Sequence, residues 1–235
     1  MSLLSQRCAA VAKLCGSGEC LADIGCDHAY VSIALVSGGA FRRAIAADLR
    51  PGPLAAAVEH VEERGLSDRI ECRLSDGLSA IAAGEADTLI CAGMGGALIE
   101  RILSTEEEKA RSFEKLILQP QSEIRSLRSW LYGSGFVIEA EDMIFEDGKY
   151  YPMFRARPAE EACTEQELFL RYGRQALEGR HPVLKNFLSH RLGIVEGLIA
   201  ELREAGEGER AAVRLKEISE ERACLLEALA FYGRE

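Results

Sequence analysis

The sequence predicts an α/β fold in which a mostly parallel sheet ends in an antiparallel hairpin and is followed by a coiled-coil-like helical hairpin. Three observations predict it. Short apolar runs alternate with helix-like stretches up to residue 157, which is typical of parallel β-α-β units with helices on both faces. Near its end this region holds two longer β-rich runs around a turn signal. Beyond it, apolar residues recur at helical spacing. We therefore expect one domain over residues 1–157 and a helical domain over residues 158–235.

Five short apolar runs are expected to form the parallel strands, and most of them end in Asp, Gly or Pro. They cover residues 19–25, 42–48, 69–75, 86–93 and 115–121. Four helix-like stretches lie between and after them, at residues 29–36, 51–64, 95–103 and 122–132. Pro51 and Pro53 suit the first turn of the second of these helices.

A β-hairpin and a set of helices are expected to complete the chain. The β-rich runs of residues 135–157 flank Glu146-Asp147-Gly148, a sequence typical of a hairpin turn. A short helix is expected over residues 164–177. Apolar residues at steps of three and four over 184–202 and 211–232 then predict two antiparallel helices, joined by a turn at 203–210.

The composition limits the classes of function. The net charge of −10 argues against a nucleic-acid-binding role for the whole surface. Residues 171–191 nevertheless hold four arginines, one lysine and two histidines against one glutamate, so a local basic face is available for phosphates, although a solvated helix face is the plainer interpretation. The apolar runs are too short to span a membrane, the N-terminus lacks the core of a signal peptide, and the eight cysteines form no C-x-x-C pair. We expect a cytoplasmic protein with no metal site.

Acidic residues follow the first three predicted strands, where ligands of open α/β sheets bind. Asp23 and Asp27 flank the first strand end, Asp48 ends the second, and Asp76 follows the third. A dinucleotide site needs a G-x-G-x-x-G loop for its pyrophosphate, whereas only Gly25 is present here. Carboxylates repel a pyrophosphate and attract a cation, so S-adenosylmethionine, with its ammonium and sulfonium groups, fits. Each Asp taken singly is equally explained as a helix or turn cap.

Six motifs in order resemble the bacterial tRNA (adenine-22-N1)-methyltransferase family, a group of class I S-adenosylmethionine-dependent methyltransferases with a Rossmann-like sheet. They are DIGCDHAY (23–30), AADLRPGPL (46–54), SDGL (75–78), AGMGG (92–96), LQPQ (118–121) and EDGKYY (146–151). The resemblance runs from about residue 3 to residue 157, and the family also carries a C-terminal helical hairpin. Gln121 in place of asparagine and Pro152 in place of an acidic residue depart from its pattern.

The resemblance implies transfer of a methyl group from S-adenosylmethionine to N1 of adenine 22 in tRNA by a monomer or weak dimer. Asp48 is expected to accept hydrogen bonds from the ribose diol, and Asp76 to reach the adenine amino group of the cofactor. Asp27 is the candidate catalytic residue, and His28 is either part of the methionine end or a hydrogen-bonded turn residue. The expected cofactor-binding residues are Asp23, Gly25, Cys26, Asp27, His28, Asp48, Leu49, Asp76, Gly77, Gly93 and Met94.

The substrate side is expected to use side chains from later in the chain. Backbone carbonyls near Gly93, with Gln119 or Gln121, would hold the target amino group, and Tyr150 or Tyr151 would stack on the extruded base. The expected phosphate contacts are Arg171, Arg174, Arg180 and Lys185, helped by Arg42, Arg43, Arg50, Arg125 or Arg128. Two alternatives stay open: a small-molecule methyltransferase whose helices form a lid or dimer contact, and a non-catalytic protein-binding regulator. A nicotinamide-dependent oxidoreductase is disfavoured by the missing glycines.

Overall fold

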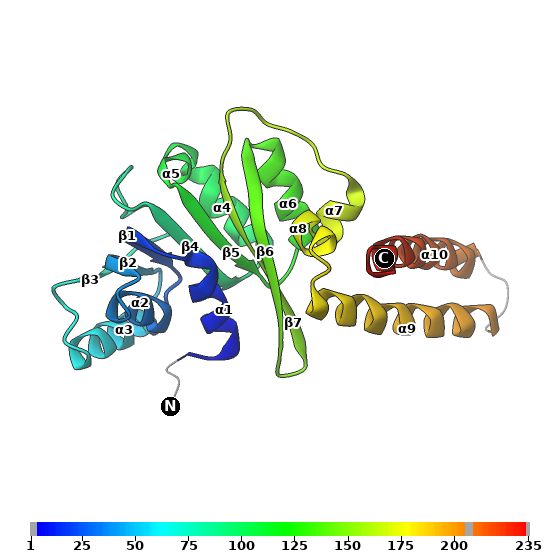
Figure 1. The fold of residues 1–235 in the computed structure, drawn as a ribbon, viewed down its shortest axis with the longest axis horizontal. Helices are drawn as coiled ribbons and strands as arrows, with labels where there is room; N and C mark the ends of the chain where they lie inside the picture. Colours follow the sequence, from blue (N-terminus) through cyan, green and yellow to red (C-terminus); the bar gives the residue numbers. More distant parts are fainter. Residues whose placement is uncertain (1–3, 205–208, 234–235) are drawn as a thin grey trace. The chain divides into compact units, whose positions relative to one another are not determined.

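A seven-stranded mixed sheet organises the first part of the chain, as Figure 1 shows. The computed structural model describes residues 4–204 and 209–233. The strands are β1 (Gly18–Ile24), β2 (Phe41–Asp48), β3 (Ile70–Leu74), β4 (Thr88–Met94), β5 (Lys115–Pro120), β6 (Phe136–Glu146) and β7 (Lys149–Pro158). Their order is β3-β2-β1-β4-β5-β7-β6, with β7 antiparallel to β5 and β6, and all other pairs parallel. The predicted fold class is confirmed.

The central strands are apolar because they are covered on both faces. Residues 20–24 of β1 and 88–91 of β4 are buried without interruption, the pattern of a parallel sheet between helices. Helices α1 (Gln6–Cys15), α2 (Tyr30–Ser37) and α3 (Pro51–Glu63) contact one another on one face. Helices α4 (Gly96–Thr105), α5 (Glu107–Ser112) and α6 (Ile124–Gly133) do so on the other (Figure 1). Neither α1 nor α5 is among the predicted helices.

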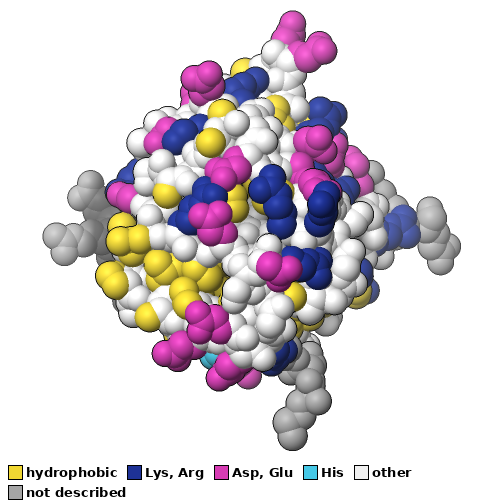
Figure 2. All heavy atoms as spheres, turned by 90° about the vertical axis from the view of Figure 1, so that its left-hand side faces the viewer, with side chains coloured by type: hydrophobic (Ala, Val, Ile, Leu, Met, Phe, Trp, Pro, Cys, Tyr) yellow, Lys and Arg dark blue, Asp and Glu magenta, His cyan; other side chains and the backbone are white. Residues whose placement is uncertain are grey.

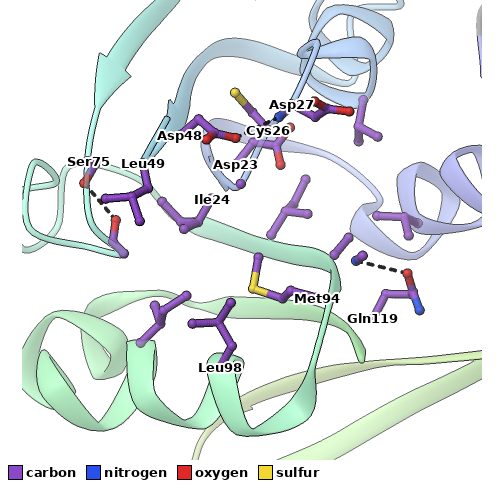
Figure 3. Close-up of a pocket in the computed structure, with 18 of the residues that line it drawn as sticks. Asp23, Ile24, Cys26, Asp27, Asp48, Leu49, Ser75, Met94, Leu98 and Gln119 are labelled. Carbon is purple, nitrogen blue, oxygen red and sulfur yellow. Dashed lines mark hydrogen bonds between the residues drawn. The ribbon is translucent and has the colours of Figure 1, made fainter. Parts of the chain in front are cut away.

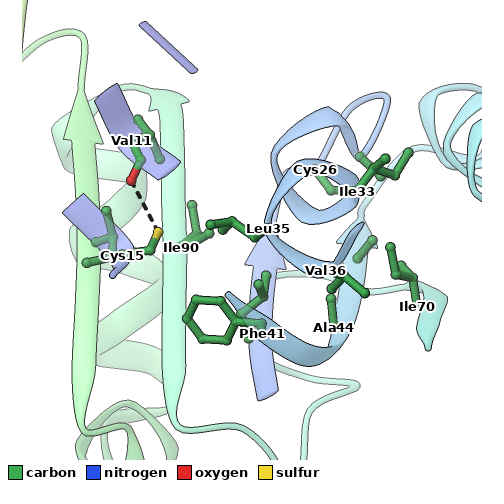
Figure 4. Close-up of a cluster of buried hydrophobic side chains, with 14 of the residues drawn as sticks. Val11, Cys15, Cys26, Ile33, Leu35, Val36, Phe41, Ala44, Ile70 and Ile90 are labelled. Carbon is green, nitrogen blue, oxygen red and sulfur yellow. Dashed lines mark hydrogen bonds between the residues drawn. The ribbon is translucent and has the colours of Figure 1, made fainter. Parts of the chain in front are cut away.

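A hydrophobic cluster joins α1 and α2 to the sheet, as Figure 4 shows. Phe41, Ile33 and Ile90 are buried in it, and the thiol of Cys15 donates a hydrogen bond to the carbonyl oxygen of Val11 over 3.2 Å. Burial raises the pKa of Cys15 to about 12, so the thiol stays protonated and packs as a small apolar group.

The hairpin of β6 and β7 has the predicted tight turn. Asp147 and Gly148 both take positive φ angles of 49° and 76°, and Glu146 pairs with Lys149, the geometry of a two-residue type I′ turn. An ion pair between Arg128 of α6 and Glu141 of β6, 2.8 Å long, fixes this hairpin to the helix behind it. The Arg128 side chain is 3% exposed, so the expectation that it contacts tRNA phosphates is wrong.

The chain divides into two compact units, residues 1–165 and 166–235. The segment after β7 stays with the first unit, because the backbone N–H of Ala159 donates to the carbonyl of Gly135 and that of Cys163 to the carbonyl of Tyr132.

The second unit is helical, with α7 (Glu167–Tyr172), α8 (Arg174–Glu178), α9 (Pro182–Glu204), α10 (Glu209–Leu229) and a 3₁₀ turn, η1 (Ala230–Tyr232). The single helix expected over residues 164–177 is wrong, because Gly173 at φ 89° separates α7 from α8. The predicted antiparallel pair is present as α9 and α10, which pack through residues such as Leu188 and Leu225 and are linked by the Arg191–Glu221 ion pair. Part of the expected turn at 203–210 lies outside the described residues.

Breaking the Arg128–Glu141 pair from one side should cost more than replacing both partners. We expect Glu141→Leu to lower the free energy of unfolding by about 3 kcal/mol, because a buried guanidinium loses its nearest carboxylate. The double variant Arg128→Met/Glu141→Leu should recover at least half of that loss. Urea unfolding measures both, and a double variant less stable than the single one would contradict the expectation.

Candidate active site

A cavity of about 510 Å³ opens at the carboxyl ends of β1, β2, β4 and β5. Its size is that of a small-molecule or cofactor pocket. The loop after β1, the ends of β2 and β4 and the start of α4 supply its walls (Figure 3). It lies where the strand order changes direction between β1 and β4, the place at which open α/β sheets bind ligands.

The loop after β1 makes a tight turn with a single glycine. Gly25 and Asp27 have φ angles of 72° and 51°, and the backbone N–H groups of Gly25 and Cys26 both donate to the carbonyl oxygen of Ala47. The positive φ of Gly25 favours glycine, and the Met94 methyl group would lie 2.9 Å from a Cβ there. The two hydrogen bonds to Ala47 hold the turn at the end of β2.

Asp48 fixes the same loop. Its Oδ2 accepts from the backbone N–H of Asp27 over 3.3 Å, and its Oδ1 accepts from that of Arg50 over 2.8 Å. The Arg50 side chain lies 3.8 Å away and is largely exposed. Asp48 is buried and lines the cavity, so it presents its carboxylate to any occupant at a fixed position.

Asp23 adds a second buried carboxylate. Burial raises its pKa to about 6, the charge of Asp48 adds to this rise, and the hydrogen bond from the Ser32 hydroxyl, 2.7 Å long, opposes it. Figure 3 shows Asp23, Asp27 and Asp48 grouped at one end of the cavity. These three residues face one space, so the cavity favours a cationic group there.

Every residue of the expected cofactor-binding set lines this cavity: Asp23, Gly25, Cys26, Asp27, His28, Asp48, Leu49, Asp76, Gly77, Gly93 and Met94. His28 Nε2 lies 3.9 Å from Asp27 Oδ1, and both side chains are substantially exposed. The binding roles of these residues stay predictions.

The two expected glutamines lie beside Gly93. Gln119 is buried and its Oε1 accepts from the backbone N–H of Gly93 over 3.1 Å, while Gln121 is exposed, and both line the cavity. Tyr150 and Tyr151 are not among the lining residues. Successive residues of a strand point to opposite faces, and Tyr150 packs on Phe145 at one face of the hairpin, so the structure separates the two tyrosines.

The four main residues expected to bind phosphates, Arg171, Arg174, Arg180 and Lys185, lie in the second unit. Arg171 pairs with Glu167 over 2.7 Å, and Arg174 pairs with Glu178 over 3.0 Å, each one helical turn apart. Arg180 and Lys185 are exposed. Their role in phosphate binding stays a prediction.

Sequence reasoning missed several lining residues, among them Arg7, Val11, Tyr30, Leu98 and Arg101. Arg7 and Val11 belong to α1, and without a predicted helix there was no reason to bring the N-terminus to the pocket. Ser75 of the SDGL motif, which follows β3, lines the cavity beside Asp76. Within residues 4–204 and 209–233, no cluster of three or more His, Cys, Asp or Glu side chains suits a metal ion. In the same part of the chain, none of the helices is long and apolar enough for a membrane span.

Comparisons with known proteins agree on one family. Residues 4–154 match the family described as "Methyltransferase domain". The tRNA (adenine(22)-N(1))-methyltransferase of Bacillus subtilis is 33% identical over 231 residues, covering 96% of this chain and 97% of that protein. The crystal structure of the B. subtilis m1A22 tRNA methyltransferase TrmK aligns with a TM-score of 0.83 at 31% identity, over 96% of this chain and 98% of that chain. The structure of Streptococcus pneumoniae Sp1610 in complex with S-adenosyl-L-methionine aligns with a TM-score of 0.84 at 31% identity, over 96% and 99% of the two chains.

The buried carboxylate of Asp23 should cost stability in the free protein. Its pKa in the folded state, about 6, lies above the ordinary value of 3.8, so the folded state is destabilised above pH 6 and regains stability as the pH falls from 6 towards 4. We expect Asp23→Asn to raise the free energy of unfolding at pH 8 by on the order of 1–3 kcal/mol, with a smaller gain at pH 5. Urea unfolding of the free protein at both pH values measures this. A gain that is absent at pH 8, or as large at pH 5, would contradict the electrostatic origin of the effect.

Proposed function

The chain belongs to the tRNA (adenine(22)-N1)-methyltransferase family, and from that premise we propose that its cavity transfers the methyl group of S-adenosylmethionine to N1 of adenine 22 in tRNA. One observation supports this most: Asp23, Asp27 and Asp48 share a single cavity, and the loop after β1 that lines it lacks the G-x-G-x-x-G sequence of a dinucleotide site. That arrangement suits a cationic nucleoside and disfavours the diphosphate of a nicotinamide cofactor. No observation favours the small-molecule or regulator alternatives.

The residues present fit S-adenosylmethionine, which supplies an electrophilic methyl group when bound. Asp48, held by two backbone N–H groups, is placed to accept hydrogen bonds from the ribose hydroxyls. We assign Asp76 and Gly77, which line the cavity, to the adenine of the cofactor. We assign Asp23 and the loop after β1 to its methionine part, which carries the positive charges. A cation that binds beside a buried carboxylate such as Asp23 stabilises its ionised form.

The target adenine must leave its stack to reach this cavity, because its N1 edge is otherwise covered. We assign the base to the space beside Gly93, Gln119 and Gln121, which all line the cavity. N1 attacks with its own lone pair, so no covalent enzyme intermediate is needed. Methylation leaves a cationic ring, and the exposed carboxylate of Asp27 is the nearest candidate to stabilise that charge.

The second unit is proposed as an additional contact for the folded tRNA. Figure 2 shows a face of the first unit, on which Lys and Arg side chains lie in small groups among Asp and Glu side chains, in agreement with the net charge of −10. For the second unit, the proposal is supported by the basic residues of segment 171–191. Exposed pairs such as Arg171–Glu167 contribute little stability, so their arginines can exchange partners for phosphates.

The double variant Arg180→Gln/Lys185→Gln should weaken tRNA binding and leave cofactor affinity unchanged. A tRNA affinity equal to that of the wild type would refute this contact. We further propose a cytoplasmic monomer or weak dimer, which sedimentation of the purified protein tests.

The reaction itself is tested by incubating the protein with methyl-labelled S-adenosylmethionine and unmodified tRNA. We expect label in 1-methyladenosine at position 22, found by nuclease digestion and nucleoside mapping. A transcript with guanine at position 22 is the matched control and should stay unlabelled. Label at another position, or none in any tRNA, would contradict the proposed function.

Two aspartates of the same loop region should separate binding from chemistry. Asp48→Ala should weaken cofactor affinity by about 10- to 100-fold, because a fixed hydrogen-bond acceptor for the ribose is lost. Asp27→Ala should lower turnover by about tenfold and change cofactor affinity less. Calorimetry and single-turnover assays measure both variants. Unchanged affinity in Asp48→Ala would refute the ribose contact, and unchanged turnover in Asp27→Ala would refute the catalytic role.

A further inference from the structure

We propose that Arg7 is the oxyanion-binding residue of the pocket: its guanidinium takes the carboxylate of the cofactor or a phosphate next to the target adenosine. Both are planar or tetrahedral oxyanions that a guanidinium binds through two N–H groups. The inference rests on the proposed function and adds to it the residue that binds the anionic group of a reactant.

The position of Arg7 is set by three neighbours at the substrate end of the cavity. Its Nη1 lies 3.4 Å from Oε1 of Gln119, and a Cβ added to Gly93 would lie only 3.1 Å from the same nitrogen. Its Cζ lies 5.4 Å from the ring centroid of Tyr151. The guanidinium therefore rests on an aromatic face and against the Gly93 turn, with Arg7 itself half-buried and lining the cavity.

The charge of Arg7 lacks an acidic partner in the part of the chain that the structure describes. The other two arginines of the cavity differ: Arg50 lies 3.8 Å from Asp48, and Arg101 lies 3.7 Å from Asp76. The guanidinium of Arg7 instead donates to a neutral amide, Gln119, which already accepts from the Gly93 backbone N–H, while Glu146 accepts only from the backbone N–H of Arg7. A half-buried cation with a neutral neighbour gains most when an anion enters.

The cavity thus offers groups of opposite charge. Asp23, Asp27 and Asp48 line it together with Arg7, which lies beside Gly93 and Gln119. The amino-acid part of S-adenosylmethionine carries an ammonium and a carboxylate on one carbon, so it suits a cavity with both carboxylates and a guanidinium. The flipped nucleotide carries phosphates, which a guanidinium also attracts. Contact between Arg7 and the target adenine ring is disfavoured, because methylation makes that ring cationic.

The hairpin holds the helix that carries Arg7. Oε1 of Glu146 accepts a hydrogen bond of 2.6 Å from the backbone N–H of Gln6, so a carboxylate of the hairpin satisfies the first turn of α1. Tyr151 lies on the same hairpin, and the guanidinium of Arg7 lies over its ring. Glu146 is a positioning residue, because its carboxylate accepts a hydrogen bond from the first turn of α1.

Calorimetry and tRNA binding with Arg7→Gln identify the anion. If it is the cofactor carboxylate, affinity for S-adenosylmethionine falls by about tenfold, while affinity for 5′-methylthioadenosine, which lacks the amino-acid part, is unchanged. If it is a phosphate, cofactor affinity is unchanged, tRNA affinity falls by about tenfold, and the slope of log affinity against log salt falls by about one. Either result supports the proposal, and normal affinity for both reactants overturns it.

Controls separate this role from folding and from the proposed function. Arg64→Gln removes one exposed charge at the end of α3 and should change neither affinity. Arg7→Lys should recover part of the loss because it keeps the charge, and thermal unfolding of each variant shows whether α1 still folds. Glu146→Gln should give a smaller loss of the same kind. Wild-type protein that binds the cofactor but does not methylate position 22 refutes the function, whereas the Arg7 result is read from binding alone.

Discussion

The burial of two carboxylates at adjacent strand ends is the constraint around which this structure is built. Asp23 and Asp48 sit at the carboxyl ends of β1 and β2, and both are 5% exposed. Hydrogen bonds from Ser32 and from two backbone N–H groups hold them, but the raised pKa of Asp23, caused by burial, shows that its charge is not fully compensated. The loop after β1 folds back onto Asp48, and its single glycine passes close to Met94. A cation bound in this cavity would compensate the remaining negative charge.

The sheet and its acidic rim could be predicted from the sequence for a simple reason. Strands covered on both faces appear as continuous apolar runs, and a carboxylate that follows such a run must lie at the edge where ligands bind. The tight hairpin turn could be predicted from two neighbouring residues, because Asp147 and Gly148 readily take positive φ angles. These features depend on residues close together in the chain.

The features that could not be predicted depend on contacts between distant residues. Helix α1 buries only Ala10, Val11 and Cys15, so its apolar pattern is weak. Its first turn is capped by the Ser5 side chain and also by Glu146 from far along the chain. The burial of Arg128 depends on Glu141 in another element. Consequently, the part of the cavity wall that α1 builds was missed, while the part built by strand ends was found.

The central claim is that ionised carboxylates, with Asp23 foremost, hold the positive charge of the cofactor. Its most direct test is the calorimetric affinity for S-adenosylmethionine between about pH 5 and pH 7, a range in which the cofactor keeps its own charges. The account predicts that affinity rises with pH and that binding near pH 6 releases protons, because the cation favours ionised Asp23. In the Asp23→Asn variant, the affinity should depend less on pH than in the wild type. An affinity that is independent of pH in the wild type, with no proton release, would contradict it.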